Sequence, residues 1–263
     1  NEIEDFYFTS FDGKKVHGLL LKPPFFDDQK KYPLIYLIHG GPQGAWEDDF
    51  HYRWNYQLFA SRGYVVAMVN FRGSKGYGQD FCDEVSKNWG GGPFQDVILG
   101  LDSLFAQFSF IDSTKVSAAG ASYGGYMINW IAVQPESAKF NCLISHAGVY
   151  DLFAEYGTTE ELWFPEWEMG GNPYENPDLY VKWSPSLLAK NLMKYKTPTL
   201  VVHGAKDYRV PISQGMQLFT ALQTYQVPSK FIYFPDENHF VLKPQNAIYW
   251  WNTCLNWIDQ WNH

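Results

Sequence analysis

Short apolar segments recur along most of the chain, and segments with helical spacing of apolar residues separate them. The strand-length apolar segments are residues 33–38, 64–69, 116–119, 142–145, 199–202 and 231–234. The helix-like segments, with apolar residues three or four positions apart, are residues 96–105, 126–132, 212–222 and 247–261. This alternation predicts an α/β fold whose mostly parallel central sheet is covered by helices on both faces.

The amino-terminal segment has a different pattern. Residues 6–11 and 15–21 are rich in aromatic and aliphatic residues and flank Asp12-Gly13, a strong signal for a hairpin turn. Pro23-Pro24 then interrupts the strand pattern. The sheet is therefore predicted to begin with an antiparallel hairpin.

The last helical segment contains several tryptophans. Its apolar residues at helical spacing are predicted to form one buried face, consisting of Ile248, Trp251, Leu255 and Ile258. We interpret these tryptophans as core residues and not as part of a cofactor site.

Residues 151–185 interrupt the alternation of strands and helices. This segment contains Trp163, Pro165, Trp167, a Gly-Gly pair and two Asn-Pro pairs. We predict an insertion or cap over the edge of the sheet, and long irregular insertions in compact domains are often functional. No repeat, low-complexity tract or linker is evident, so residues 1–263 are expected to form one domain.

Composition and charge exclude several classes of protein. Hydrophobic residues make up 46% and charged residues 18%, which is typical of a globular domain. The net charge of -8 offers no general attraction to phosphate or anionic lipid, so neither nucleic acid nor a membrane is an expected partner. No apolar run approaches the ~18 residues that a membrane-spanning helix needs. Cys82, Cys142 and Cys254 are scattered and odd in number, and we interpret them as packed thiols.

The chain opens at Asn1 and continues directly into strand-like sequence, without the pattern of a signal peptide. It also lacks an Asn-x-Ser/Thr acceptor for glycosylation. We expect a processed or truncated chain, and the sequence fits a cytoplasmic, periplasmic or secreted location. A homo-oligomer is compatible with these features.

Gly120-Ala-Ser122-Tyr-Gly124 matches the nucleophile elbow, a sharp strand-to-helix turn at which only small neighbours fit. The pattern alone would occur by chance in roughly one chain in ten of this length. Here a strand-like segment, residues 115–119, precedes the motif, and a helical segment, residues 125–132, follows it. This context predicts an α/β-hydrolase fold with Ser122 as the nucleophile.

An α/β-hydrolase carries its catalytic histidine after the last strand. Of the seven histidines, only His239 and the terminal His263 follow the last predicted strand, and His239 lies in the expected loop. We interpret His146 and His203 as strand-end residues.

The catalytic acid should follow a preceding strand. Asp207 lies just beyond the strand at residues 199–202, at the carboxyl edge where active sites of open sheets gather. Asp236 is the rival, but it precedes His239 by only three residues and would struggle to reach the imidazole from behind. Asp207 is therefore the predicted acid.

These residues form a predicted Ser-His-Asp triad, in which the imidazole accepts the serine proton and the carboxylate fixes its tautomer. His39-Gly40-Gly41-Pro42 follows a predicted strand and offers unobstructed backbone N–H groups, so Gly41 and Tyr123 are the predicted oxyanion donors. Gly-Gly-Pro also forms tight turns on its own, and the presence of Ser122 favours the oxyanion hole. No metal-binding or nucleotide-binding motif is present, so no cofactor or metal is expected.

Seven motifs are spread over nearly the whole chain, namely His39-Gly-Gly-Pro-Gln, Asn70-Phe-Arg-Gly-Ser-Lys-Gly-Tyr-Gly78, Trp89-Gly-Gly, Gly120-Ala-Ser-Tyr-Gly-Gly-Tyr126, Thr158-Thr-Glu-Glu-Leu-Trp-Phe164, Asp207-Tyr-Arg-Val-Pro211 and Asp236-Glu-Asn-His239. In these motifs the chain resembles the prolyl oligopeptidase family of serine peptidases. Within that family it resembles the acylaminoacyl-peptidase and type V dipeptidyl-peptidase branch. The resemblance implies the same triad and oxyanion donors, hydrolysis of short peptides, and a place for Arg209 beside the substrate.

Family members usually carry an amino-terminal β-propeller, and this chain has none. It is expected to be either a catalytic fragment or a stand-alone member whose open site prefers esters or small amides. A carboxylesterase, which uses the same triad, is the alternative function. A non-catalytic binding module is less favoured because all three triad residues are present.

Substrate contacts are predicted around Arg209, which lies two residues beyond Asp207 and could clamp a peptide carbonyl. The alternative for Arg209 is an ion pair with a neighbouring acid such as Glu237, and the resemblance favours the clamp. Apolar surface near the elbow and in the insertion predicts an aliphatic or aromatic P1 side chain and rejection of a basic one. This surface consists of Val210, Tyr126, Trp163 and Phe164.

Overall fold

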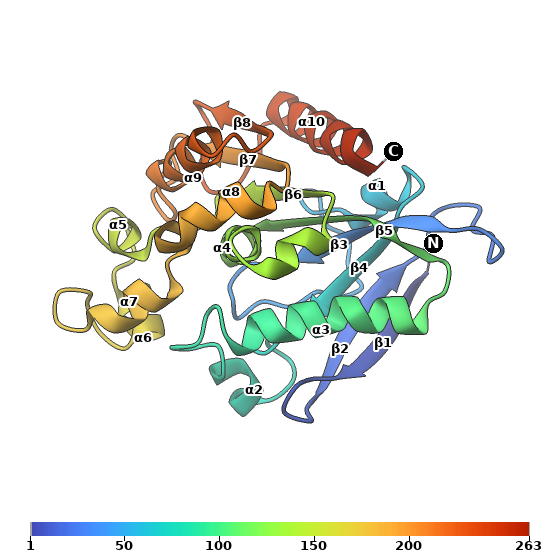
Figure 1. The fold of residues 1–263 in the computed structure, drawn as a ribbon, viewed down its shortest axis with the longest axis horizontal. Coiled ribbons are helices and arrows are strands. Elements are labelled where there is room, and N and C mark those ends of the chain that lie inside the picture. The colour runs from blue at the N-terminus through green and yellow to red at the C-terminus, as the bar shows by residue number, and fades with distance from the viewer. Residues whose placement is uncertain (1, 263) are drawn as a thin grey trace.

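One eight-stranded sheet organises the molecule, in the order β1-β2-β4-β3-β5-β6-β7-β8. The computed structural model describes residues 2–262; Asn1 and His263, at the ends of the predicted domain, lie outside this range. The strands are β1 (Ile3–Thr9), β2 (Lys15–Leu21), β3 (Tyr32–Ile38), β4 (Val65–Asn70), β5 (Ile111–Ala121), β6 (Cys142–His146), β7 (Thr199–Gly204) and β8 (Ser229–Phe234). β1 and β2 pair antiparallel at one edge, and β3 to β8 run parallel to one another, which confirms the predicted sheet and hairpin (Figure 1).

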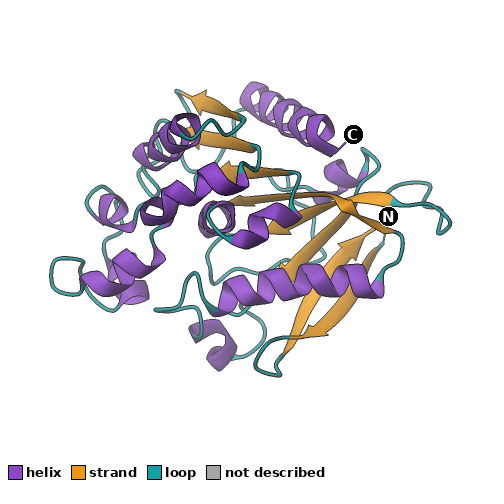
Figure 2. Ribbon diagram, in the orientation of Figure 1, coloured by secondary structure: helices purple, strands orange, loops and turns teal. Residues whose placement is uncertain are grey.

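Helices lie on both faces of the sheet (Figure 2). The helices are α1 (Tyr56–Ala60), α2 (Gln79–Asp83), α3 (Gly92–Gln107), α4 (Tyr123–Ala132), α5 (Leu152–Tyr156), α6 (Trp163–Met169), α7 (Pro177–Trp183), α8 (Leu192–Tyr195), α9 (Ser213–Thr224) and α10 (Pro244–Asn262), with 3-10 turns η1 (Pro135–Lys139) and η2 (Pro185–Asn191). No helix within residues 2–262 is long and apolar enough to cross a membrane.

The pleat of the strands divides the apolar side chains between two cores. In β3, Leu34, Tyr36 and Ile38 enter the core shared with α3, α4 and α9. Ile35 and Leu37 of the same strand enter the core shared with α1 and α10. The near-continuous apolar sequence of the parallel strands follows from this burial on both faces.

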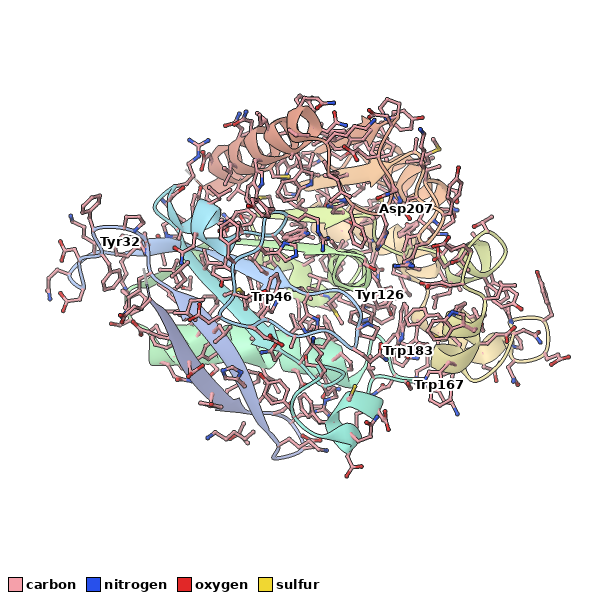
Figure 3. The ribbon with its side chains drawn as sticks, turned by 180° about the vertical axis from the view of Figure 1, so that it is seen from behind. Tyr32, Trp46, Tyr126, Trp167, Trp183 and Asp207 are labelled. Atoms are coloured by element: carbon pink, nitrogen blue, oxygen red, sulfur yellow. The ribbon has the colours of Figure 1, made fainter. Side chains whose placement is uncertain are left out.

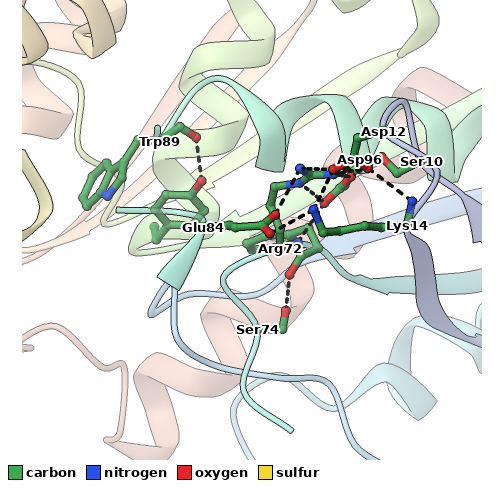
Figure 4. A network of polar contacts seen from close by, with 10 residues as sticks. Ser10, Asp12, Lys14, Arg72, Ser74, Glu84, Trp89 and Asp96 are labelled. Carbon is green, nitrogen blue, oxygen red and sulfur yellow. Dashed lines mark hydrogen bonds and ion pairs between the residues drawn. The ribbon is translucent and has the colours of Figure 1, made fainter. Parts of the chain in front are cut away.

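A buried ion network fixes the amino-terminal hairpin to the rest of the sheet. Arg72, directly after β4, binds both carboxylate oxygens of Asp96 on α3, at 2.8 and 2.9 Å. The same guanidinium binds Asp12 in the hairpin turn at 3.0 Å and Glu84 at 3.2 Å (Figure 4). Because Asp96 is fully buried, this bidentate pair replaces its lost hydration.

The buried face of α10 differs from the prediction. Ile248 is 63% exposed, so its predicted place in the core was wrong, whereas Leu255 and Ile258 are buried as predicted. Ile248 lies near the start of α10, where the helix lines the cavity described below. Trp250 takes the buried position instead, and Trp251 is only partly buried, against Phe59.

The segment at residues 151–185 lies between β6 and β7 and contains three short helices, α5, α6 and α7. These helices lie together beyond the carboxyl ends of the parallel strands (Figure 1). The segment predicted to be an insertion therefore stands beside the edge of the sheet where ligands of open α/β folds bind.

Candidate active site

Ser122 occupies the turn between β5 and α4, with φ of 59° and ψ of -121°. A non-glycine residue with positive φ is strained, and such strain is common at functional sites. A Cβ on Gly120 would overlap the backbone of Gly124, and a Cβ on Gly124 would overlap the carbonyl of Ile38. Both glycines of the motif are thus required by close backbone approach, and the backbone N–H of Ser122 donates to the carbonyl of His146 at 3.0 Å.

His239 lies on the loop after β8, with its Nδ1 2.7 Å from Oδ2 of Asp207. This distance corresponds to a strong hydrogen bond between imidazole and carboxylate. Asp236, the rival acid, instead accepts hydrogen bonds from Lys243 and Asn246. The geometry therefore places Asp207, and not Asp236, against the imidazole.

The carboxylate of Asp207 is held by its own loop. Its Oδ1 accepts hydrogen bonds from the backbone N–H groups of Arg209 and Val210, at 3.1 and 2.9 Å, and Oδ2 lies 3.5 Å from His203 Nε2. Burial opposes ionisation, but the hydrogen bonds with His203 and His239 outweigh it and hold the pKa of Asp207 below its usual range. The acid remains a carboxylate across the neutral range.

The turn after β3 lies against the nucleophile. A Cβ on Gly40 would stand 3.1 Å from the Cβ of Ser122, so the backbone of this turn closely approaches the serine. Gly41 follows with φ of 122°, a conformation that favours glycine. The hydroxyl of Tyr123 is buried and donates to the Trp89 carbonyl at 2.7 Å. Only the backbone N–H of Tyr123 therefore remains for the predicted oxyanion hole.

Ser122 and His239 line one cavity of about 830 Å³. One side of it, the insertion-side wall, comes from the insertion and neighbouring loops and consists of Trp89, Val149, Leu152, Glu155, Phe164 and Val210. A second group of lining residues, the helix-side wall, comes from the loop after β3, the end of β6, the loop after β8 and α10, and consists of Trp46, Arg53, Trp54, His146, Phe240 and Trp250. Its tryptophans pack in the core shared with α1 and α10, whereas the apolar residues of the insertion-side wall pack in the other core. Figure 3 shows Trp46 on the loop after β3 and Asp207 near the end of β7.

Most of the predicted substrate residues reach this cavity. Arg209, Val210, Trp163 and Phe164 line it. Tyr126 does not, because it is fully buried on α4 and packs against Trp89 and Tyr123.

The guanidinium of Arg209 forms ion pairs with two acids of the insertion, Glu161 at 3.2 Å and Glu160 at 3.5 Å. Glu237, the acid named as its alternative partner, accepts hydrogen bonds from the backbone N–H groups of Leu242 and Lys243 instead. An ion pair is thus present, with partners that lie nearly fifty positions away in the sequence and were not expected.

Glu155 lines the cavity and was missed by the sequence analysis. It is 7% exposed, its Oε2 has no hydrogen-bond partner within residues 2–262, and burial raises its pKa well above the ordinary value. Its position one helical turn after Asp151 in a non-periodic segment gave no signal.

Among the described residues, no group of three or more His, Cys, Asp or Glu side chains is arranged to hold a metal ion.

Comparisons with known proteins agree with this geometry. The sequence profile of the prolyl oligopeptidase family matches residues 50–263. Dipeptidyl-peptidase 5 of Schizosaccharomyces pombe is 44% identical over 97% of this chain, and dipeptidyl-peptidase 5 of Aspergillus fumigatus is 42% identical over all of it. The chain spans only 37% and 36% of the lengths of these two relatives.

Two solved structures have the same fold. The Pyrococcus horikoshii acylaminoacyl peptidase superposes with a TM-score of 0.90 at 31% identity, covering 99% of this chain and 42% of that one. An acylaminoacyl peptidase in complex with Z-Gly-Gly-Phe-chloromethyl ketone superposes with a TM-score of 0.91 at 31% identity, with the same coverage. The chain belongs to the prolyl oligopeptidase family of serine peptidases.

Proposed function

We propose that this protein hydrolyses short peptides, as a dipeptidyl- or acylaminoacyl-peptidase, through an acyl-enzyme on Ser122. The observation that carries the proposal is the 2.7 Å contact between His239 and Asp207 beside a strained serine in one cavity. A serine hydroxyl is a weak nucleophile until a positioned base removes its proton. The relatives named dipeptidyl-peptidase 5 and acylaminoacyl peptidase support a peptide substrate.

In the proposed mechanism, Ser122 Oγ attacks the scissile carbonyl while neutral His239 accepts its proton. Asp207 stabilises the resulting imidazolium, and the backbone N–H groups of Gly41 and Tyr123 stabilise the oxyanion. His239 then protonates the leaving amine, and the peptide C–N bond breaks. Water, activated by His239, attacks the acyl-enzyme and returns Ser122 to its free form.

The insertion-side wall is the proposed P1 pocket and favours an aliphatic or aromatic side chain. Val149, Leu152 and Val210 are buried and apolar, and burial of one such substrate side chain contributes roughly 1.5–3 kcal/mol. Burial raises the pKa of Glu155, so the pocket disfavours a charge on this carboxyl. The Phe of the chloromethyl ketone bound by the acylaminoacyl peptidase is consistent with an apolar pocket.

Arg209 is proposed to clamp a peptide carbonyl of the substrate. Its ion pairs with Glu160 and Glu161 involve a side chain that is 44% exposed. Exposed pairs of this kind contribute only about 0–1 kcal/mol, so a desolvated substrate carbonyl can compete for one N–H of the guanidinium.

The deciding experiment compares turnover of a dipeptidyl anilide and an acylaminoacyl anilide with that of a nitrophenyl ester. We expect the anilides to be cleaved efficiently once the greater intrinsic reactivity of the ester is taken into account. Efficient ester hydrolysis with negligible anilide cleavage by the folded protein would favour a carboxylesterase instead. If the folded protein neither turns over these substrates nor reacts with a fluorophosphonate, the result would favour a non-catalytic binding module.

Residues 1–263 are proposed to be the catalytic domain of a longer protein in which another domain, a β-propeller, covers the cavity mouth. The greater length of the relatives supports this proposal. Large apolar side chains at the cavity, namely Tyr52, Trp163, Leu242 and Ile248, are between 59% and 84% exposed and are suited to such a contact.

A further inference from the structure

The helix-side wall contains four buried nitrogen atoms for which the described residues offer no hydrogen-bond partner. The indole Nε1 atoms of Trp46 and Trp250, and both ring nitrogens of His146, are buried and have no hydrogen-bond partner within residues 2–262. His146 and Trp250 are only 5% and 4% exposed, and all three residues line the active-site cavity. These nitrogens have almost no accessible surface, so the rings contribute aromatic surface to the cavity and leave the pairing with a charged ligand group to other residues.

The protonation state of His146 defines the chemistry of this wall. Burial, with a further contribution from the nearby His239, lowers the pKa of His146 to about 3. The ring is therefore neutral at physiological pH and offers one N–H donor and one acceptor. His146 therefore adds no positive charge to this wall at physiological pH.

Arg53 adds a positive charge to the same wall. Its guanidinium carbon lies 4.2 Å from the ring centre of Phe240, and its side-chain hydrogen bond is to His51 Nε2 at 3.3 Å. No ion pair of Arg53 with a carboxylate exists within residues 2–262. The acid on this wall, Asp49, is exposed to solvent. A partly desolvated guanidinium without a carboxylate partner is suited to bind an anionic group of a ligand.

The position of this wall relative to the triad identifies the part of the substrate that would reach it. His239 must protonate the leaving amine, so the leaving group lies on the side of the cavity that His239 faces. Phe240 follows His239, its ring lies 5.2 Å from the imidazole, and Arg53 stacks on its face. The insertion-side wall is already assigned to the acyl part of the substrate. The helix-side wall is therefore next to the leaving group.

We propose that the helix-side wall binds the free α-carboxylate of the leaving group, with the guanidinium of Arg53 as its counter-ion. This inference rests on the proposed peptidase function. The preferred leaving group is a single amino acid, because one residue spans only about 3.5 Å and keeps its carboxylate close to His239. The substrates are then tripeptides in the dipeptidyl mode, or N-acyl dipeptides in the acylaminoacyl mode.

The test compares matched pairs of substrates that differ only at the leaving carboxylate. The pairs are Ala-Phe-Ala and Ala-Phe-Ala-amide, and acetyl-Phe-Ala and acetyl-Phe-Ala-amide, and the two corresponding Phe nitroanilides serve as references without a carboxylate. In the wild type, kcat/KM should be about tenfold higher for the free acid than for the amide, as expected for a charge-assisted hydrogen bond. The preference should decrease at high salt.

Arg53→Met should reduce the acid-to-amide ratio of kcat/KM to near one, because only the free acid loses a charged partner. Arg62→Met is the matched control, because Arg62 is a nearby arginine that pairs with Asp259 outside the cavity, and it should keep the wild-type ratio. Circular dichroism verifies that each variant is folded.

A wild-type acid-to-amide ratio of one or less would overturn the carboxylate subsite, as would a folded Arg53→Met variant with the wild-type ratio. If Arg53→Met does not fold, the wild-type ratio and its salt dependence decide alone. In each of these cases the nitroanilides are still cleaved, so the proposed peptidase function stands. Failure of the folded wild type to cleave any of the peptides or nitroanilides would contradict the proposed function itself.

Discussion

Replacement of Asp207 by Asn should abolish most of the activity without unfolding the protein. Asp207 Oδ1 accepts two backbone N–H groups, from Arg209 and Val210, and an amide oxygen can accept the same bonds. The amide NH₂ would then face His239 Nδ1, which lies 2.7 Å from Oδ2 in the wild type. An NH₂ donor at this position requires Nδ1 to be an acceptor, so the proton moves to Nε2, where it blocks uptake of the serine proton.

The size of the effect follows from two losses. The buried, charge-assisted hydrogen bond that stabilises the imidazolium contributes about 1.5–3 kcal/mol. The wrong tautomer of His239 adds to this, and triads of this geometry lose about 10⁴-fold in kcat on the same substitution, or about 5.4 kcal/mol.

The assay is single-substrate kinetics on a dipeptidyl or acylaminoacyl nitroanilide at neutral pH, with thermal unfolding measured on the same samples. Asp236→Asn is the matched control. Because Asp236 is bound to Lys243 and Asn246 and not to His239, this variant should retain activity close to that of the wild type. An active Asp207→Asn variant beside an inactive, folded Asp236→Asn variant would refute the assignment of the acid.

Three further predictions follow from other parts of the site. Gly124→Ala should lower the free energy of unfolding, measured in urea, by about 3 kcal/mol, because the added Cβ would overlap the carbonyl of Ile38. Gly157→Ala is the control and should be nearly neutral, because its added Cβ would have no atom closer than 3.7 Å. Glu155→Gln should raise the Tm at neutral pH, because burial penalises the ionised form of Glu155 and raises its pKa on folding. The gain should vanish below the ordinary glutamate pKa of 4.5, where the carboxyl is neutral in both states, and an unchanged Tm at both pH values would contradict this effect of burial. Arg209→Met should lower kcat/KM for peptides much more than for a short nitrophenyl ester, which has no second carbonyl, and equal losses would assign Arg209 a structural role.

The predictions that depended on local pattern were largely confirmed. The parallel strands and their sheet could be predicted from apolar runs because burial on both faces requires such runs, and the hairpin could be predicted from Asp12-Gly13. The pairing of His239 with Asp207 follows from chain order, since the carboxyl ends of parallel strands meet at one edge of the sheet.

Features that depend on where the chain places distant segments could not be predicted. The ion pairs of Arg209 form with the insertion, whose path over the sheet edge has no periodic signal. Ile248 has the spacing of a core residue, but it is exposed at the start of α10, where the helix lines the cavity. Glu155 and His146 are exceptional only through their burial without partners, which is a property of the folded state.

The most direct test of the catalytic account is covalent labelling of the protein with a fluorophosphonate, followed by mass spectrometry of its peptides. Reaction requires a serine activated by a base, so one adduct per chain is expected, on Ser122, and labelling should disappear in Ser122→Ala together with nitroanilide turnover. Labelling of the folded wild type at a different serine, or a Ser122→Ala variant that retains a tenth of the wild-type turnover, would contradict the assignment of Ser122 as the nucleophile.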